Sequence, residues 1–292
     1  MILDRFAVLD IGTNSAYLVV AEKRRGSRFS VLDKHKVILR LGDELDLYSR
    51  LMSEDGCKKV VDVIRQMQKI VSHYKASCRV VATHALRKSK NRDEILNRVY
   101  EETGVKIELI DGVEEARLIT LGVLAAFPVK QEKLLVVDIG GGSTELACCQ
   151  GESIEYTSSL QMGAVVLTKM FLKDKKVGRK ELNEMRQHIS KRIAPLASEL
   201  GLLKFDAAIL CSGTGKALAS IDSFEQNITF SDINGYQIPT KRLNLIVKKV
   251  FALKEPKNFM KKWQVERNRA EILLAGAMIL EVLTETLNVK GW

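Results

Sequence analysis

Small and acidic residues near the middle of the chain carry the clearest chemical signal. Asp138 ends an apolar segment, residues 140–142 are all glycine, and Ser143, Thr144 and Glu145 follow. Because Gly140, Gly141 and Gly142 have no Cβ atoms, successive backbone N–H groups can line a concavity and bind phosphate oxygens. The hydroxyl groups of Ser143 and Thr144 add donors, and the Asp138 carboxylate can hold Mg²⁺ directly or through water.

The same pattern occurs a second time near the N-terminus. AVLDIGTNSAYLVV (residues 7–20) aligns with LVVDIGGGSTELAC (residues 135–148), which places Asp10 on Asp138 at a separation of 128 residues. Such internal repeats indicate related structural units. The first copy adds Asp10 as a candidate metal ligand, and its candidate phosphate ligands are Gly12, Thr13, Asn14 and Ser15.

Each turn is expected to join the two strands of a β-hairpin, because apolar, strand-like segments flank it on both sides. A Rossmann or P-loop turn would instead open a helix, and neither G-K-[ST] nor G-x-G-x-x-G occurs here. For one copy alone, an ordinary tight hairpin without a ligand is about equally acceptable. Two matched copies that share an aspartate favour anion binding.

Strands and helices alternate along the chain, which is typical of an α/β fold. Further strands are expected at 79–83, 107–110 and 207–211, and helices at 54–75, 93–103, 114–126, 180–200, 216–221, 242–251 and 271–287. Residues 212–215 are expected to form a turn between strand and helix. A polar stretch around Pro128 suggests a boundary between two domains, 1–126 and 127–292.

Composition limits the classes of partner and compartment. Five cysteines without C-x-x-C spacing argue against a disulfide framework or zinc site and favour a reducing compartment. We expect a cytoplasmic protein without membrane contact, since no leader-like or membrane-spanning segment is visible. The net charge of +10 favours a polyanionic partner, and residues 241–270 hold ten Lys/Arg against two Glu. That run is either a solvated helical face or one wall of an anion-binding groove.

With these residues in place, the chain resembles the exopolyphosphatase/guanosine pentaphosphatase (Ppx/GppA) family of the actin-like ATPase superfamily. Seven motifs in order carry the resemblance: DIGTNS (10–15), RLGDEL (40–45), ATHALR (82–87), GVEEARLI (112–119), DIGGGSTEL (138–146), LQMGAVVLT (160–168) and SGTGKALA (212–219). The resemblance implies two actin-like (ribonuclease H-like) domains with a phosphate-binding cleft between them. It also implies Mg²⁺-dependent release of the terminal phosphate of inorganic polyphosphate, or of the 5′-γ-phosphate of guanosine pentaphosphate.

The resemblance also assigns roles to individual residues. Glu115 matches the catalytic base, Glu145 the second essential carboxylate, and Asp138 the aspartate that supports the metal ion. Arg87 and Arg117 match residues suited to phosphate. In the superfamily the segment of Gly213 and Thr214 faces a nucleotide base, so a guanosine substrate would use it more than polyphosphate. Polyphosphate or guanosine penta-/tetraphosphate is thus the expected partner, a specific nucleic acid is not, and a homodimer stays open.

Three departures from the family pattern leave alternatives open. Residues 15–18 read S-A-Y-L where relatives carry S-F-R-L, with an Arg or His at the position of Tyr17, and Val166 replaces an arginine. The chain lacks the helical HD-like extension of many relatives and ends at Trp292, before their closing segment, which leaves open whether the C-terminus is truncated. These departures keep a non-catalytic binder of polyphosphate or guanosine tetra-/pentaphosphate as an alternative to a phosphohydrolase. A phosphotransferase of the same superfamily is a second alternative, although Glu115 as a water-activating base argues against it.

Overall fold

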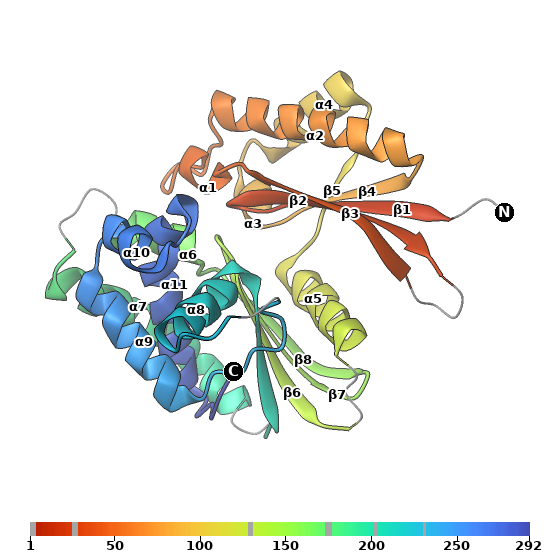
Figure 1. Ribbon diagram of the computed structural model, residues 1–292. Helices are drawn as coiled ribbons and strands as arrows, with labels where there is room; N and C mark the ends of the chain where they lie inside the picture. Colours follow the sequence, from red (N-terminus) through yellow and green to blue (C-terminus); the bar gives the residue numbers. More distant parts are fainter. Residues whose placement is uncertain (1–3, 25–28, 128–130, 173–176, 201–203, 230–231) are drawn as a thin grey trace. The chain divides into compact units, whose positions relative to one another are not determined.

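The computed structural model describes residues 4–24, 29–127, 131–172, 177–200, 204–229 and 232–292 (Figure 1). The chain divides into a first unit, Met1–Asp111, and a second unit, Gly112–Trp292. This division corrects the predicted boundary at 126/127. Helix α5 (Gly112–Ala126) belongs to the second unit because its apolar side chains, among them Val123, pack on the sheet of that unit.

The first unit is built on a five-stranded sheet in the order β3-β2-β1-β4-β5. The strands are β1 (Arg5–Ile11), β2 (Ser15–Lys23), β3 (Phe29–Ile38), β4 (Ser77–Ala82) and β5 (Ile107–Leu109). Strand β1 pairs antiparallel with β2 and parallel with β4. Its side chains alternate between buried (Ala7, Leu9, Ile11) and exposed (Val8, Asp10), as expected for a sheet with one face in a core.

Two long helices, α2 (Glu54–Tyr74) and α4 (Arg92–Thr103), cover the buried face of this sheet (Figure 1). The Ser53 hydroxyl caps α2 by accepting the Gly56 N–H, and Gly104 ends α4 with a left-handed backbone, φ 71°. Two short helices, α1 (Leu41–Glu44) and α3 (His84–Lys88), follow β3 and β4.

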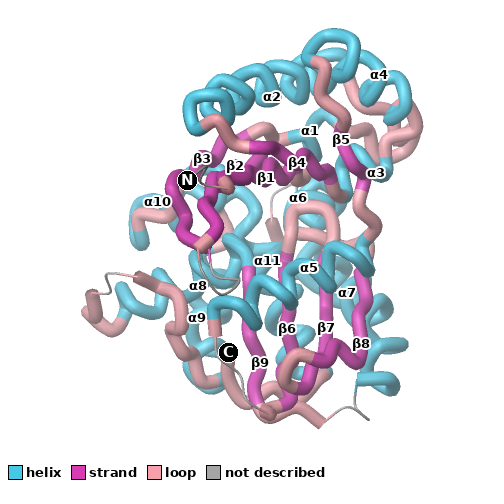
Figure 2. The backbone as a smooth tube through the Cα atoms, turned by 90° about the vertical axis from the view of Figure 1, so that its right-hand side faces the viewer, coloured by secondary structure: helices cyan, strands magenta, loops and turns pink. Residues whose placement is uncertain are grey.

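The second unit contains a four-stranded sheet in the order β8-β7-β6-β9, which is covered on both faces (Figure 2). The strands are β6 (Lys133–Ile139), β7 (Thr144–Gln150), β8 (Ser153–Leu160) and β9 (Ala207–Cys211). Along β6, Leu134 and Val136 face α5, whereas Leu135 and Val137 face the larger helical core. Strands buried on both faces become continuously apolar, and β6 shows this pattern.

The larger core of the second unit is formed by the remaining helices. These are α6 (Ala164–Leu167), a π-helical turn (Thr168–Leu172), α7 (Arg179–Leu200), α8 (Ser212–Glu225), α9 (Thr240–Leu253), α10 (Pro256–Trp263) and α11 (Arg267–Thr286). Helix α11 is central, with fourteen of its residues buried. None of the helices in the described ranges is long and apolar enough to cross a membrane.

The internal repeat seen in the sequence is also a repeat of topology. In both units an antiparallel hairpin is followed by a third antiparallel strand, and its first strand pairs in parallel with a later one. Both predicted hairpins are confirmed, β1–β2 and β6–β7. Strands β3 and β8 were not predicted, because each alternates polar and apolar residues along one edge of its sheet and lacks a continuous apolar run.

Candidate functional site

The two glycine-containing turns have the same local geometry. In the first turn (residues 12–15) the Gly12 N–H donates to the Ser15 carbonyl at 3.0 Å, and in the second turn (residues 140–143) the Gly140 N–H donates to the Ser143 carbonyl at 3.0 Å. A Cβ atom on Gly12 or on Gly140 would lie 3.1 Å from that same carbonyl oxygen. The tight closure of each turn therefore favours a glycine at this shared position.

Each turn is held by the segment that follows the third strand of its unit. Behind the second turn, the Ala164 and Val165 N–H groups donate to the Gly140 and Gly141 carbonyls, both at 2.9 Å. A Cβ atom on Gly163 would lie 2.4 Å from the Gly141 carbonyl. These bonds occupy the carbonyl oxygens of the turn. Within the described ranges, no hydrogen bond is donated by the backbone N–H groups of residues 141–143.

The first turn is braced in the equivalent way. The Gly42 N–H donates to the Thr13 carbonyl at 2.9 Å, and the Leu39 and Arg40 N–H groups donate to the Asn14 carbonyl at 3.0 Å. The RLG segment therefore supports the first turn as Gly163 and its neighbours support the second. Backbone N–H groups presented together in this way form an anion-binding concavity.

Three carboxylates meet on the face of the second sheet that α5 covers. Asp138 on β6 and Glu145 on β7 are directly paired residues, so their side chains lie on the same face. That face is the one on which Val136 and Ala147 pack against α5. Glu115 lies in the first turn of α5, and its negative charge acts on Glu145. The geometry thus brings together the three carboxylates that the resemblance singled out in this unit.

Glu145 is the least solvated member of the group, with 2% of its surface exposed. Its Oε1 accepts a hydrogen bond from the Ser159 hydroxyl at 2.8 Å, whereas its buried Oε2 has no hydrogen-bond partner among the described residues. Burial, followed by the negative charge of Glu115, raises the pKa of Glu145 to about 8, with Asp138 adding to the rise. The Ser143 and Ser159 hydroxyl groups act in the opposite direction.

A cation would relieve this arrangement. A buried carboxylate oxygen without a donor, beside two further carboxylates, is stabilised by a positive charge. Oxygen donors of this kind suit Mg²⁺, so Asp138 and Glu145 fit as its ligands. Asp10 belongs to the first unit, and within the described ranges no three His, Cys, Asp or Glu side chains have the spacing of a preformed metal site.

Arg269 lies beside the predicted segment at Gly213, and the sequence analysis did not single it out. It lies in the first turn of α11, is partly buried, and places its guanidinium against Gly213, where a Cβ atom would lie 2.0 Å from one of its nitrogen atoms. Burial lowers the pKa of Arg269, while the charges of Glu266 and Asp138 raise it. The one sequence signal was a basic residue in the first turn of an apolar helix, where the helix dipole disfavours it.

The segment around Gly213 and Thr214 is helical, which corrects the predicted turn over residues 212–215. Helix α8 begins at Ser212, four residues before the expected start at Lys216. The absent side chain of Gly213 accommodates Arg269, so a residue with low helix propensity is retained inside the helix. Thr214 is buried, and its hydroxyl oxygen has no partner among the described residues.

The remaining predicted phosphate ligands are engaged with protein groups. The Thr144 hydroxyl donates to the Met162 carbonyl at 2.6 Å. The Arg117 guanidinium is exposed and donates to both carboxylate oxygens of Glu114, at 2.7 and 2.8 Å. Arg87, in the first unit, donates to the Ile110 carbonyl at 2.6 Å. These contacts position the three side chains, and their binding roles stay predictions.

The basic run over residues 241–270 is largely compensated by carboxylates. Five of its ten cations form ion pairs: Arg242, Lys249, Lys257, Lys262 and Arg267. Glu225 forms ion pairs with Lys249 and Lys262 and accepts a hydrogen bond from the Trp263 indole N–H. These contacts lower the pKa of Glu225 to about 2, and the hydrogen bond from Lys249 has the largest effect. This pairing favours the solvated helical face over a continuous anion groove.

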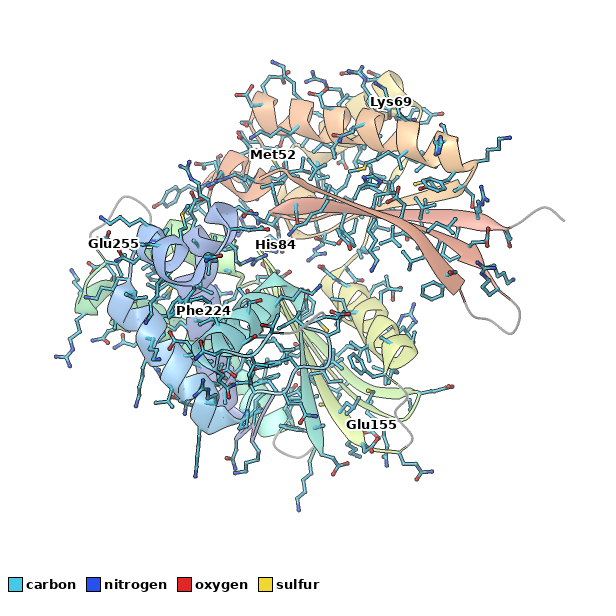
Figure 3. All side chains as sticks on the ribbon, viewed as in Figure 1. Met52, Lys69, His84, Glu155, Phe224 and Glu255 are labelled. Atoms are coloured by element: carbon cyan, nitrogen blue, oxygen red, sulfur yellow. The ribbon has the colours of Figure 1, made fainter. Side chains whose placement is uncertain are left out.

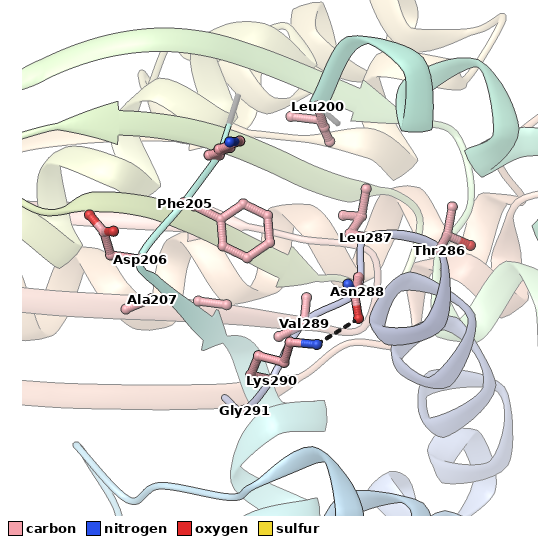
Figure 4. A pocket seen from close by; sticks show the side chains of 12 residues that line it. Leu200, Phe205, Asp206, Ala207, Thr286, Leu287, Asn288, Val289, Lys290 and Gly291 are labelled. Atoms are coloured by element: carbon pink, nitrogen blue, oxygen red, sulfur yellow. Dashed lines mark hydrogen bonds between the residues drawn. The ribbon is translucent and has the colours of Figure 1, made fainter. Parts of the chain in front are cut away.

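A separate cavity of about 470 Å³ lies at the other end of the second sheet (Figure 4). Phe205, Leu287 and Val289 contribute apolar walls, and the Lys290 ammonium donates to the Asn288 side chain at 3.0 Å. The cavity adjoins Ala207 at the start of β9, whereas Asp138 pairs with Cys211 at its end. None of the predicted site residues lines it.

The chain belongs to the Ppx/GppA phosphatase family, whose profile matches residues 19–291. Exopolyphosphatase 1 of Mycobacterium leprae is 33% identical over 219 residues, which cover 74% of this chain and 64% of that protein. This chain therefore spans slightly less than two thirds of the mycobacterial relative. A putative exopolyphosphatase of Haemophilus influenzae is 28% identical over 97% of this chain and 85% of its own length.

Solved structures confirm the expected fold class. The PPX-GPPA enzyme of Aquifex aeolicus superposes with a TM-score of 0.80 at 26% identity, covering 99% of this chain and 94% of its own. An exopolyphosphatase from Cytophaga hutchinsonii superposes with a TM-score of 0.89 at 22% identity, covering 99% of this chain and 92% of its own. The α/β fold with two sheet-based, actin-like units is thus that of the family.

Substitution of Gly163 by alanine tests the support of the second turn. The added Cβ atom would lie 2.4 Å from Gly141 backbone atoms, so we expect a loss of about 1–3 kcal/mol in the free energy of unfolding. Gly122→Ala is the matched control, since its Cβ atom meets nothing within 4 Å and should gain about 0.5–1 kcal/mol in α5. Urea unfolding measures both, and equal stability of the two variants would refute the close contact.

Substitution of Glu145 by glutamine tests the buried carboxylate. Because the pKa of Glu145 is raised, the protonated carboxyl contributes fully to the free energy of unfolding below about pH 4.5. This contribution is lost as the pH rises through about 8. Without metal, Glu145→Gln should therefore be more stable than the wild type by about 1–3 kcal/mol at pH 8, and equal to it at pH 4.5.

Thermal unfolding between pH 4.5 and 8, with a chelator and then with Mg²⁺, measures this difference. Mg²⁺ should raise the melting temperature of the wild type and not that of the variant. Glu152→Gln, at an exposed carboxylate, is the control and should change neither response. A variant that is no more stable than the wild type at pH 8 contradicts the prediction.

Proposed function

We propose that this chain is a phosphohydrolase that releases the terminal phosphate of inorganic polyphosphate, the 5′-γ-phosphate of guanosine pentaphosphate, or both. The observation that carries the proposal is the second turn beside the carboxylates of Glu115, Asp138 and Glu145. Among the described residues, the backbone N–H groups of residues 141–143 in this turn donate no hydrogen bond. Exopolyphosphatase relatives support the substrate class. Phosphoryl transfer requires mainly positioning and neutralisation of charge, and this arrangement offers both.

Glu115 is the proposed general base. It is partly accessible to solvent, in contrast to Glu145, so water can reach it. It also lies in the first turn of α5, where the helix dipole favours the ionised carboxylate. An ionised carboxylate in this position can orient a water molecule and accept its proton during in-line attack on phosphorus.

Neutralisation of the phosphate oxygens is divided among several groups. The N–H groups of Gly141, Gly142 and Ser143 are proposed to bind the terminal phosphate, and the first turn (residues 12–15) is proposed as a second phosphate-binding element. Arg269 supplies a partly buried positive charge near Asp138. Asp138 and Glu145 would hold Mg²⁺, which when bound polarises phosphate oxygens and offsets their charge.

The alternatives make different predictions in one set of assays. A phosphohydrolase releases phosphate from polyphosphate or guanosine pentaphosphate with Mg²⁺ and needs no acceptor. A phosphotransferase would consume ATP only when a sugar or acid acceptor is present. A non-catalytic binder would retain both ligands and release nothing, and that result would refute the proposal.

The Glu115→Gln substitution tests the general base. It keeps the size of the side chain and removes its basicity, so turnover should fall by about 10²–10⁴-fold while the ligand still binds. Glu114→Gln is the matched control, because Glu114 is engaged by Arg117 on the exposed side of α5. Phosphate release and equilibrium binding are measured on both variants. Near-normal turnover in Glu115→Gln would remove this residue from the mechanism.

A further inference from the structure

A cluster of positively charged side chains in the first unit has no role in the function proposed above. Arg50 and Lys88 form no ion pair within the described ranges, yet they lie close together and close to Arg87. Burial, and after it the charges of Arg50 and Arg87, lowers the pKa of Lys88. Like charges gathered in this way destabilise the fold unless an anion accompanies them.

The cluster is built by specific contacts. The Lys90 N–H donates to the Arg50 carbonyl at 2.8 Å. The Met52 N–H donates to the Asn91 side-chain oxygen at 3.0 Å, and the Asn91 amide donates back to the Met52 carbonyl at 3.1 Å. These hydrogen bonds join residues 50–52 to residues 90–91, and they place Arg50 beside the end of α3.

A buried histidine lies within this cluster (Figure 3 labels His84 and Met52). His84 is 8% exposed, and its Nδ1 has no hydrogen-bond partner among the described residues. Burial, then Arg87, Lys88 and Arg50, lowers its pKa to about 4, so the ring is neutral and adds no repulsion. In the tautomer that carries its proton on Nδ1, the ring can donate a hydrogen bond to an oxyanion.

Arg50 occupies a backbone position that an arginine adopts at some cost. Its φ of 60° is left-handed, where glycine or asparagine is more easily accommodated. The side chain there is exposed, so packing does not account for it.

The cluster also lies at the same edge of the sheet as the first turn. Strands β1 and β4 are parallel neighbours with Ile11 opposite Ala82, and the Thr83 N–H donates to the Ile11 carbonyl at 3.1 Å. The first turn therefore leaves the sheet beside the start of α3. Ligands of α/β sheets bind at the carboxyl ends of parallel strands, which is this edge.

We propose that Arg50 and Lys88 form a phosphate-binding subsite in the first unit, at the same edge of the sheet as the first turn. This inference rests on the proposed function. The chemistry is that of a phosphate oxyanion bound by two cations. The phosphate can come from the interior of a polyphosphate chain or from the 3′-diphosphate of a guanosine nucleotide.

The test uses Arg50→Gly and Lys88→Gln, each combined with Glu115→Gln so that binding is measured without turnover. Arg50→Gly removes the charge and relaxes the left-handed backbone, so its melting temperature should not fall. Lys36→Gln and Lys69→Gln are matched controls, because each removes one exposed charge from the same unit (Lys69 is labelled in Figure 3). Melting temperatures are recorded for all four.

Each subsite variant should weaken the binding of long-chain polyphosphate or of guanosine pentaphosphate by about tenfold, as for one charge-assisted hydrogen bond. The plot of log affinity against log salt concentration should become less steep by about 0.7, by analogy with single-stranded nucleic acids. The controls should change affinity less than twofold. With Glu115 intact, KM should rise and kcat should not change.

The two ligands are measured separately to identify the source of the phosphate. An effect on polyphosphate alone assigns the subsite to an interior phosphate, and an effect on the nucleotide alone assigns it to the 3′-diphosphate. Affinities equal to those of the controls for both ligands would overturn the subsite and leave the proposed hydrolase intact. Binding without any phosphate release by the wild type would instead overturn the hydrolase and leave the subsite standing.

Discussion

The second turn depends on hydrogen bonds that reach it from behind. The N–H groups of Ala164 and Val165 occupy the carbonyl oxygens of Gly140 and Gly141, which leaves the N–H side of the turn without internal acceptors. Only glycine at position 163 permits this approach. Donors fixed in place by the fold are preorganised, and preorganisation is what makes electrostatic stabilisation effective. A related bond lies behind the first turn, where the Gly42 N–H donates to the Thr13 carbonyl as the Val165 N–H does to the Gly141 carbonyl.

The carboxylates beside the second turn are destabilising in the protein alone. Glu145 is buried with one oxygen unpartnered, next to two further negative charges. The remaining structure tolerates this because α5 and the larger helical core fasten the sheet on both faces. Strain stored at a functional site and offset elsewhere is a general property of active sites. Asp138 near the end of β6 and Glu145 near the start of β7 place this charge at the turn end of the hairpin.

Much of this architecture could be predicted from the sequence. The repeated aspartate and small-residue turn predicted both hairpins, because apolar segments on each side allow nothing else. The predicted boundary between the two units was wrong. The polar stretch after α5 marks only the end of that helix, whereas the packing of α5 on the second sheet, which decides the unit it belongs to, is seen only in the fold. Arg269 was missed for a similar reason. Its contact with Gly213 joins two helices far apart in the chain, and no short-range pattern encodes such a meeting.

The paired positions in the two hairpins differ in one respect. Asp138 faces Glu145 across its hairpin, whereas Asp10 faces Tyr17, which is 39% exposed. The repeated segment therefore has the same backbone turn in both units and a second acidic side chain in only one. The turn and the acidic pair are separable features of the repeat, since the first unit forms the turn without the pair.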